Sequence, residues 1–375
     1  MKKTAWILII LLIIVAIFAF YRKDNKVVGD NIKIGIAVGL TGYAANWGEG
    51  ETKAIALAYD EYKDRLPNVE FITENTKSDG LGTVNAIKKL VEIDKVQAII
   101  GPTWGDSFQG GYPIATQAQV PVITPSAAFE SLEKGSRTSF MFSTWWPQAK
   151  EAKTIIDHMK ASGVKKIAIL HDQDAFNTSF GDLFKSVAEQ ETQNTLVSER
   201  IVVPVGTTDF RTNIAKIGAF KPDTLLVLLQ DTSAVGPLMK QLKEQNVKIA
   251  VYSTTSAENE DNIKKFPGLF NGLVYSFPAY SEDAAYQKIK EAFVKKYGTG
   301  VVEGPAFVNA YNAAKALFEA LLIGIQSGQE LSQAIQSLKT TGIGVSELSF
   351  DQGGQIQNAN FKMKKIENDS FIDLN

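Results

Sequence analysis

The chain has 375 residues, which is more than one compact core usually takes, so two lobes are expected. Charged residues make up 21% of the chain and the net charge is −2, a balance that does not favour a nucleic-acid partner. The absence of cysteine and the presence of only two histidines exclude disulfides, zinc–thiolate sites, a catalytic thiol, lipidation at cysteine and a histidine-rich metal centre.

The first expected element is an apolar segment, Ala5 to Tyr21, which contains no glycine, proline or charged residue. At ~1.5 Å per residue it is just long enough for a membrane-spanning helix, which needs ~17–25 residues. Its end lacks the Ala-x-Ala pattern of a signal-peptidase site, so residues 1–24 are interpreted as a membrane anchor or uncleaved signal. A cleaved signal peptide is the alternative. Basic residues flank the segment almost equally on both sides, so they do not orient it in the membrane.

A polar tether, residues 25–31, leads into an alternation of strands and helices. Short apolar runs with β-branched residues predict the strands, and apolar residues three or four apart predict the helices. The expected strands are 32–38, 69–73, 98–101, 121–124, 166–171, 199–203, 224–229 and 249–252, with a further segment at 139–144. The expected helices among them are 48–66, 82–94, 108–119, 147–162, 180–192, 210–219 and 234–245.

The last part of the chain predicts two long helices, 282–297 and 307–326, a short helix near 332–338 and a β-rich tail. Strands that alternate with helices form parallel sheets with right-handed crossovers. Two such series in one chain predict an α/β protein with two doubly wound parallel-sheet lobes. Ligands of such sheets bind at the carboxyl ends of the strands. The loops to consider are therefore those after Val38, Ile100, Thr124, His171, Leu229 and Tyr252.

The sequence lacks the common motifs of nucleotide-binding and hydrolytic enzymes. It has no G-x-x-x-x-G-K-[ST] phosphate loop and no G-x-S-x-G elbow, and the glycines after the first strand miss the spacing of a dinucleotide fingerprint. His171, Asp172 and Asp174 lie in one loop without a second pair of ligands, so they are interpreted as a polar loop rather than a metal site. The chain is therefore not expected to be an enzyme, and no metal or cofactor is expected.

Several segments share their order and spacing with a known protein family. They are Ile34–Gly42, Ala98–Pro102, Val120–Ala127, Lys166–Asp172, Thr207–Phe210 and Pro222–Val227. From Asn31 to its C-terminus the chain resembles the type I periplasmic solute-binding proteins of ABC transporters, of the leucine/isoleucine/valine-binding kind that includes amide receptors. The resemblance implies two lobes joined by three crossover strands. It places residues 32–144 plus 280–345 in lobe one and residues 145–279 plus 346–375 in lobe two.

The resemblance also implies a function. It indicates an extracytoplasmic receptor that captures a small polar ligand, such as an amino acid, amide or amine, and delivers it to an ABC permease. A ligand sensor or regulator on the same fold, which acts through a protein partner, is the alternative. The binding domain is then expected on the periplasmic or outer side of the cell membrane, held there by the single N-terminal anchor.

Matching positions give a set of candidate ligand-binding residues. They are Trp47, Trp104, Asp106, Ser107, Ser126, Ala127, Phe176, Asp231 and Thr255. Trp47 and Phe176 stand where relatives have an aromatic residue in each lobe, although Trp47 could instead be a core residue. Ser126 and Ala127 match the loop whose backbone and hydroxyl groups hold the ligand in relatives.

Three departures from the family argue against a leucine-like ligand. Gly105 stands where relatives place a serine for the ligand carboxylate, and Thr255 stands where they place an acidic residue for the ammonium group. Asp106 would repel a carboxylate, unless it caps its own helix. Trp145 and Trp146 either reach the cleft or pack at the hinge. The remaining aromatic and acidic side chains favour a cationic or amide-like ligand.

Overall fold

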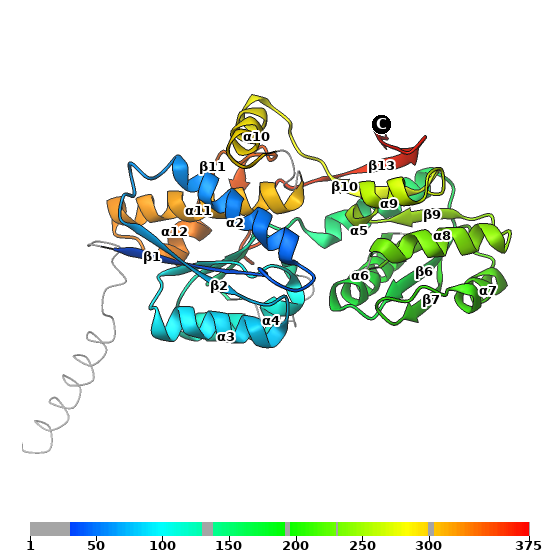
Figure 1. Cartoon of the computed structure of the whole chain (residues 1–375), viewed down its shortest axis with the longest axis horizontal. Helices are drawn as coiled ribbons and strands as arrows, with labels where there is room; N and C mark the ends of the chain where they lie inside the picture. Colours follow the sequence, from blue (N-terminus) through cyan, green and yellow to red (C-terminus); the bar gives the residue numbers. More distant parts are fainter. Residues whose placement is uncertain (1–30, 130–137, 192–195, 230–231, 299–303, 375) are drawn as a thin grey trace, which may run out of the picture.

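The computed structural model describes residues 31–129, 138–191, 196–229, 232–298 and 304–374, and it describes only the backbone of residues 105–109, 191, 196–198 and 232. Figure 1 shows two lobes side by side, joined by segments of chain that pass between them. The predicted anchor, Ala5 to Tyr21, and the candidate residue Asp231 lie outside the described residues. Within the described ranges, no helix is long and apolar enough to cross a membrane.

The first lobe contains a parallel sheet with the strand order β2-β1-β3-β4-β5. Its strands are β1 (Ile32–Val38), β2 (Val69–Asn75), β3 (Ala98–Ile100), β4 (Val122–Thr124) and β5 (Met141–Ser143). Side chains of β1 alternate between two cores: Ile34 and Ile36 pack on one face and Ala37 packs on the other. Both faces of the inner strands are buried, which explains why β3, β4 and β5 are largely apolar, whereas the edge strand β2 is partly exposed and carries polar and charged side chains.

Helices cover both faces of this sheet. In Figure 1, α2 and α11 lie above the sheet and α3 and α4 lie below it. The upper layer consists of α2 (Ala45–Asp60), α10 (Ala284–Tyr297), α11 (Pro305–Ser327) and α12 (Leu331–Gln336). The lower layer consists of α3 (Gly80–Lys88), its π-helical continuation η1 (Lys89–Ile93) and α4 (Gly105–Gln117). A short antiparallel pair, β11 (Lys339–Thr340) and β12 (Leu348–Ser349), completes the lobe.

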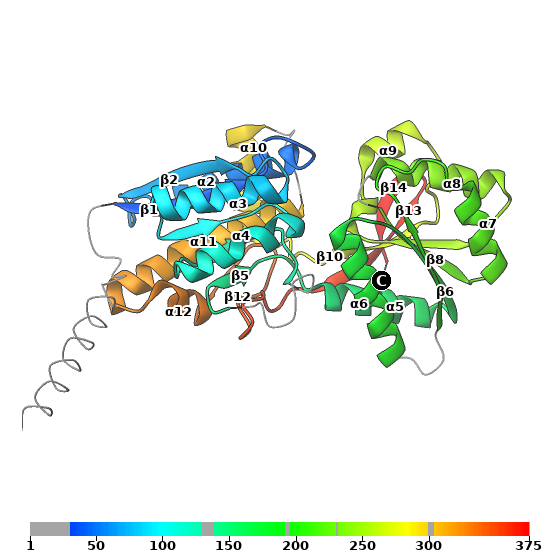
Figure 2. The same ribbon diagram turned by 90° about the horizontal axis from the view of Figure 1, so that it is seen from below.

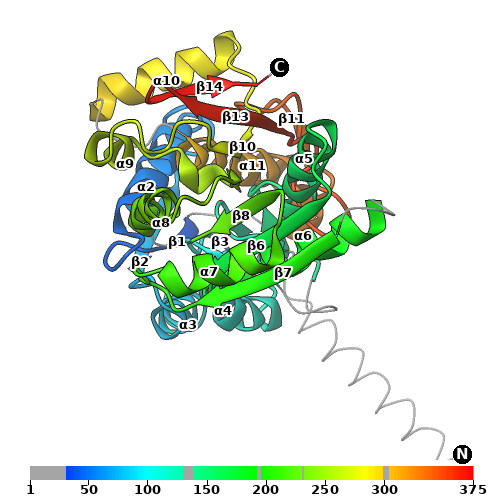
Figure 3. The ribbon, with the colours of Figure 1, turned by 90° about the vertical axis from the view of Figure 1, so that its right-hand side faces the viewer.

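The second lobe contains a sheet with the order β14-β13-β10-β9-β8-β6-β7, and Figure 3 shows β7 at one edge and β14 at the other. Its strands are β6 (Lys166–Asp172), β7 (Leu196–Val203), β8 (Thr224–Leu228), β9 (Ala250–Ser253), β10 (Val274–Pro278), β13 (Phe361–Glu367) and β14 (Ser370–Asp373). One face packs on α5 (Gln148–Ala161) and α6 (Ala175–Glu191). The other packs on α7 (Arg211–Phe220), α8 (Val235–Glu244) and α9 (Glu260–Lys265).

The prediction that the second strand series closes at Tyr252 is wrong. Strand β10 pairs in parallel with β9, and β13 then pairs antiparallel with β10. Strand β10 is short and ends in Pro278, which lacks an amide hydrogen. Because proline is disfavoured within strands, the sequence pattern did not predict a strand here. The second sheet is consequently mixed, with a parallel part and an antiparallel edge.

Three segments connect the lobes: residues 144–147, 279–283 and 360–361. Figure 2 shows β10 and β13 at this junction. Each segment contributes one aromatic ring to a common cluster. The ring of Trp146 lies 5.0 Å from that of Tyr280 and 5.7 Å from that of Phe361, and Trp146 is only 2% exposed. Aromatic packing therefore joins all three crossings.

The third crossing lies later in the chain than expected. The second lobe was expected to resume at residue 346, but Phe350, Ile356 and Ala359 pack in the core of the first lobe. Strand β13, which begins at Phe361, belongs to the second sheet. We therefore propose that the chain changes lobes at residues 360–361.

Candidate functional site

The carboxyl ends of the parallel strands of both sheets face the junction of the lobes. Strand β5 ends at Ser143 and leads directly into the first crossing, and β10 ends at Pro278 and leads into the second. Helices α4 and α6, which follow β3 and β6, contact each other across the junction. Ligands of open α/β sheets bind at the carboxyl ends of the strands, so this junction is the candidate site.

Aromatic side chains from both lobes meet at this edge. We refer to Tyr43, Trp47, Trp104, Trp145 and Phe176 as the aromatic group. Successive ring centroids are 5.0 Å (Tyr43–Trp104), 5.9 Å (Trp104–Trp47), 6.3 Å (Trp47–Trp145) and 6.5 Å (Trp145–Phe176) apart. These distances are typical of interacting aromatic pairs. The group is continuous from lobe one, through the first crossing, to lobe two.

The position of Trp47 depends on the glycine that follows it. Helix α2 begins at Ala45 and packs tightly against the loop after β1. A Cβ atom at Gly48 would lie 2.3 Å from the carbonyl oxygen of Gly39, a backbone atom that cannot easily move. Glycine therefore permits the close approach that brings the first turn of α2, and with it Trp47, to the sheet edge.

Trp104 and Trp145 are held through their backbones. Trp104 precedes α4 with a φ of 68°, an uncommon conformation for a bulky residue, and its N–H donates to the hydroxyl of Ser126 at 3.3 Å. The N–H of Trp145 donates to the hydroxyl of Ser143 at 3.0 Å, and its carbonyl accepts a hydrogen bond from the side-chain amide of Gln355. The backbones of both tryptophans are thus held by residues of lobe one.

A polar loop positions Phe176 in lobe two. Asp174 accepts hydrogen bonds from the N–H groups of Phe176 at 2.9 Å and Asn177 at 3.2 Å, as a helix cap does. Asp172 accepts from the side chain of Asn177 at 2.8 Å, and His171 accepts from Arg200 at 2.7 Å. These polar groups hold the loop. Among the described residues, no group of three or more His, Cys, Asp and Glu is placed to hold a metal ion.

A buried carboxyl group lies beneath the aromatic group. Glu51 follows Trp47 by one helical turn and is completely buried. Its two oxygens accept hydrogen bonds from the hydroxyls of Thr103 and Ser126, each at 2.5 Å. The indole N–H of Trp47 also favours the ionised carboxylate of Glu51, but more weakly than the two hydroxyls do. Its geometry does not meet the criteria of a hydrogen bond. Burial raises the pKa of Glu51 from 4.5 to about 7, although these donors act to lower it.

Through these hydroxyls, Glu51 connects three loops at the carboxyl ends of the strands. The oxygen of Thr103 also accepts from the N–H of Gly39 at 3.1 Å, in the loop after β1. The oxygen of Ser126, in the loop after β4, accepts from the N–H of Trp104 in the loop after β3. The carboxyl group of Glu51 therefore holds together the three lobe-one loops that lie next to the aromatic group.

The structure brings together some of the predicted ligand-binding residues. Trp47, Trp104 and Phe176 belong to the aromatic group, and Ser126 lies buried beside it. Ala127 is also buried, and its carbonyl accepts a hydrogen bond from the hydroxyl of Ser143 at 2.8 Å. A role in ligand binding stays a prediction for each of them.

The remaining candidates are less well placed or less fully described. Asp106 and Ser107 lie in the first turn of α4, where only the backbone is described. Thr255 begins η4 (Thr255–Ala257) after β9, and its hydroxyl donates to the carbonyl of Ser276 at 3.4 Å. This bond directs Thr255 toward β10. Its part in binding also stays a prediction.

Sequence analysis missed Glu51 and Thr103. Glu51 lies in a stretch with Glu49 and Lys53, which is typical of a solvent-exposed helix face. The available signal was its spacing of four residues from Trp47, which places both side chains on one face of α2. Thr103 follows an apolar strand, at an edge where polar side chains gather.

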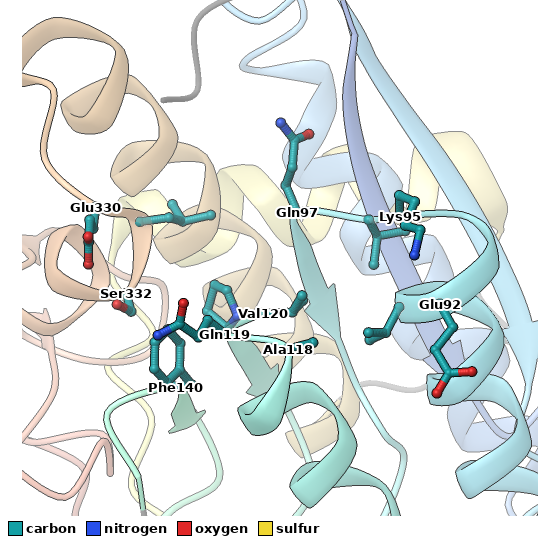
Figure 4. A pocket seen from close by; sticks show the side chains of 13 residues that line it. Glu92, Lys95, Gln97, Ala118, Gln119, Val120, Phe140, Glu330 and Ser332 are labelled. Atoms are coloured by element: carbon teal, nitrogen blue, oxygen red, sulfur yellow. The ribbon is translucent and has the colours of Figure 1, made fainter. Parts of the chain in front are cut away.

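A pocket of about 450 Å³ lies at the opposite edge of the first sheet (Figure 4). Gln97, Gln119 and Phe140 line it just before β3, β4 and β5 begin, and Glu330 and Ser332 line it at the start of α12. It is separated from the aromatic group by the length of the sheet. This pocket is therefore not the site that the strand ends predict.

Comparison with known proteins gives one family match. Residues 31–364 match the family model described as "Periplasmic binding protein". No curated protein sequence matches the chain. Among solved structures, an ABC transporter substrate-binding protein from Sphaerobacter thermophilus has a TM-score of 0.80 at 19% identity, over 92% of this chain and 96% of the other.

Two further structures are similar over 92% of this chain. A leucine-binding protein from Thermotoga maritima has a TM-score of 0.77 at 18% identity, with 98% of its own chain covered. A solute-binding protein from R. palustris in complex with benzoate has a TM-score of 0.77 at 16% identity, with 95% of its own chain covered. At these identities the structural likeness shows the fold.

Proposed function

Because this chain belongs to the periplasmic binding protein family, a family of solute receptors and not of enzymes, we propose how it acts and on what. It captures a small polar ligand, an amino acid, amide or amine, between its two lobes outside the cytoplasm. It then delivers this ligand to the permease of an ABC transporter. The family likeness supports solute binding, and the chemistry of the site supports the class of ligand.

The aromatic group is the observation that carries this proposal. It draws Trp47 and Trp104 from lobe one and Phe176 from lobe two, with Trp145 on the crossing between them. A ligand that contacts rings of both lobes favours the closed arrangement over the open one, which is how hinged receptors capture small molecules. Tryptophan faces also attract cations, with ~0.5–2 kcal/mol per contact.

We expect Trp47→Ala to weaken ligand binding on the order of 10- to 100-fold, because the substitution removes a large ring from the site. The full chain is first screened by thermal shift against amino acids, amides, polyamines, quaternary amines, sugars and aromatic acids. The ligand that raises the melting temperature most is then titrated by calorimetry into the wild type and the variant.

Leu81→Ala is the matched control. Leu81 is 73% exposed at the start of α3, so its removal should leave the affinity unchanged. Equal affinities of the wild type and Trp47→Ala would rule out the aromatic group as the site. A screen without any hit, on protein shown to be free of carried-over ligand, would count against the receptor function itself.

We also propose that residues Ala5 to Tyr21 anchor the receptor in the membrane. The full chain is expected in the membrane fraction and to be released by detergent but not by salt. An arginine at Ile13 and another at Ile14 should weaken insertion, since each costs ~2.5–3.5 kcal/mol at the centre of a spanning helix. An N-terminus found by mass spectrometry between residues 22 and 31 would instead support the cleaved signal peptide.

A further inference from the structure

We propose that Glu51 determines the specificity of the site: it makes lobe one accept an amide or ammonium group of the ligand and reject a carboxylate. The inference rests on the proposed function, because it concerns the ligand of the same site. It combines three features of the described residues: the hydroxyl groups bound to Glu51, the isolation of its charge and an unpaired donor in the aromatic group.

The two hydroxyl groups that bind Glu51 have no hydrogen left for a ligand. A hydroxyl group has one hydrogen to donate. Those of Thr103 and Ser126 both donate to Glu51, at 2.5 Å, and their oxygens accept from backbone N–H groups. A ligand carboxylate needs donors at this edge. With Glu51 ionised, neither hydroxyl can serve as one.

The charge of Glu51 is not balanced by a neighbour. Among the described side chains, the groups that influence its pKa are Ser126, Thr103 and Trp47, all of them neutral. The residue is completely buried beside the indole of Trp47, where the field of a charge is screened less than in water. The field therefore extends to a ligand on the aromatic group, repels a carboxylate and attracts an ammonium group.

The aromatic group also holds a donor that an amide can use. The indole N–H of Trp145 is buried and has no hydrogen-bond partner among the described residues. A buried donor without a partner is costly, and an amide carbonyl oxygen would satisfy it. A carboxylate would satisfy it too, so the charge of Glu51 decides between the two groups.

Matched pairs of ligands test the inference. Benzamide and benzoate, and isovaleramide and isovalerate, differ within each pair only in an amide group against a carboxylate group. The affinity of the full-length wild type for each is measured by calorimetry at about pH 8, where Glu51 is ionised. The amide should bind on the order of tenfold or more tightly than its acid. In Glu51→Gln this preference should fall by a similar factor.

Glu49→Gln is the control. Glu49 lies on the same helix but is exposed, with its carboxylate 2.6 Å from the ammonium group of Lys53. This variant removes the same formal charge from the surface and should keep the wild-type preference. If Glu49→Gln and Glu51→Gln change the preference equally, or if the wild type binds the acid as tightly as the amide, the inference is overturned.

The wild type provides an independent test without a substitution. At about pH 5.5 Glu51 is protonated, whereas benzoate, an ordinary carboxyl group, stays ionised. The preference for benzamide over benzoate should then shrink toward that of Glu51→Gln, and an unchanged preference would overturn the inference. If the wild type binds neither member of either pair, the selectivity is disproved, and the wider ligand screen alone decides whether the receptor function stands.

Discussion

Replacement of Trp146 by alanine is expected to lower the free energy of unfolding by ~3–5 kcal/mol, the range for removal of a large buried aromatic side chain. Trp146 is 2% exposed, and its ring contacts Tyr280 and Phe361, one from each of the other two crossings. The cavity would open where the three crossings meet. Chemical denaturation of both proteins at the same pH measures this loss.

The same substitution should loosen the relative placement of the lobes. Because the chain has no cysteine, two cysteines can be introduced as the only attachment sites for spin labels. Suitable exposed positions are Leu81 in lobe one and Val205 in lobe two. The distribution of distances between the labels should be broader in Trp146→Ala than in the wild type. Trp146→Phe is the control, because the indole N–H of Trp146 has no partner among the described residues and only ring size is lost. If Trp146→Ala lowers the free energy of unfolding by less than ~1 kcal/mol and leaves the distribution of label distances unchanged, Trp146 does not hold the three crossings together.

The layers of the fold could be predicted from the sequence because parallel strands are buried on both faces. Runs such as Ala98–Ile100 and Leu225–Leu228 are wholly apolar, and the helices between them carry apolar residues at helical spacing. Strand β10 was not predicted, because it has only five residues and its terminal Pro278 weakens the pattern of a strand. Its neighbours β9 and β13 come from distant parts of the chain, so only tertiary structure shows the pairing.

The site was harder to predict for a related reason. The positions of Trp47, Trp104 and Phe176 follow from strand ends and from the family resemblance, so sequence reasoning could single them out. The burial of Glu51 cannot be read from its neighbours, since a glutamate between Glu49 and Lys53 is typical of a solvated helix face. Its partners Thr103 and Ser126 come from two other loops, and they meet Glu51 only once the sheet has formed.

The stability of the wild type should fall as the pH rises from about 4.5 to about 7, and Glu51→Gln should lack this loss. The pKa of Glu51 is raised from 4.5 in the unfolded chain to about 7 in the folded protein. Between these values the folded protein keeps a proton that the unfolded chain has released. The favourable contribution of this proton is complete below pH 4.5 and is lost as the pH passes 7. Linkage gives a total loss of ~3 kcal/mol.

Glutamine has the shape of the protonated side chain, so Glu51→Gln should match the wild type in acid and be more stable by ~1–3 kcal/mol at about pH 8. Denaturation midpoints of the wild type, Glu51→Gln and Glu49→Gln, measured across this range, separate Glu51 from other titrating groups. Glu49→Gln should follow the wild type because Glu49 is exposed. A variant that gains stability while it loses the preference for amides would show that the buried charge costs stability and confers selectivity. Parallel curves for the wild type and Glu51→Gln would instead mean that folding leaves the pKa of Glu51 near 4.5. Glu51 would then be ionised at about pH 5.5 as well as at about pH 8, and the preference for amides should not shrink in acid.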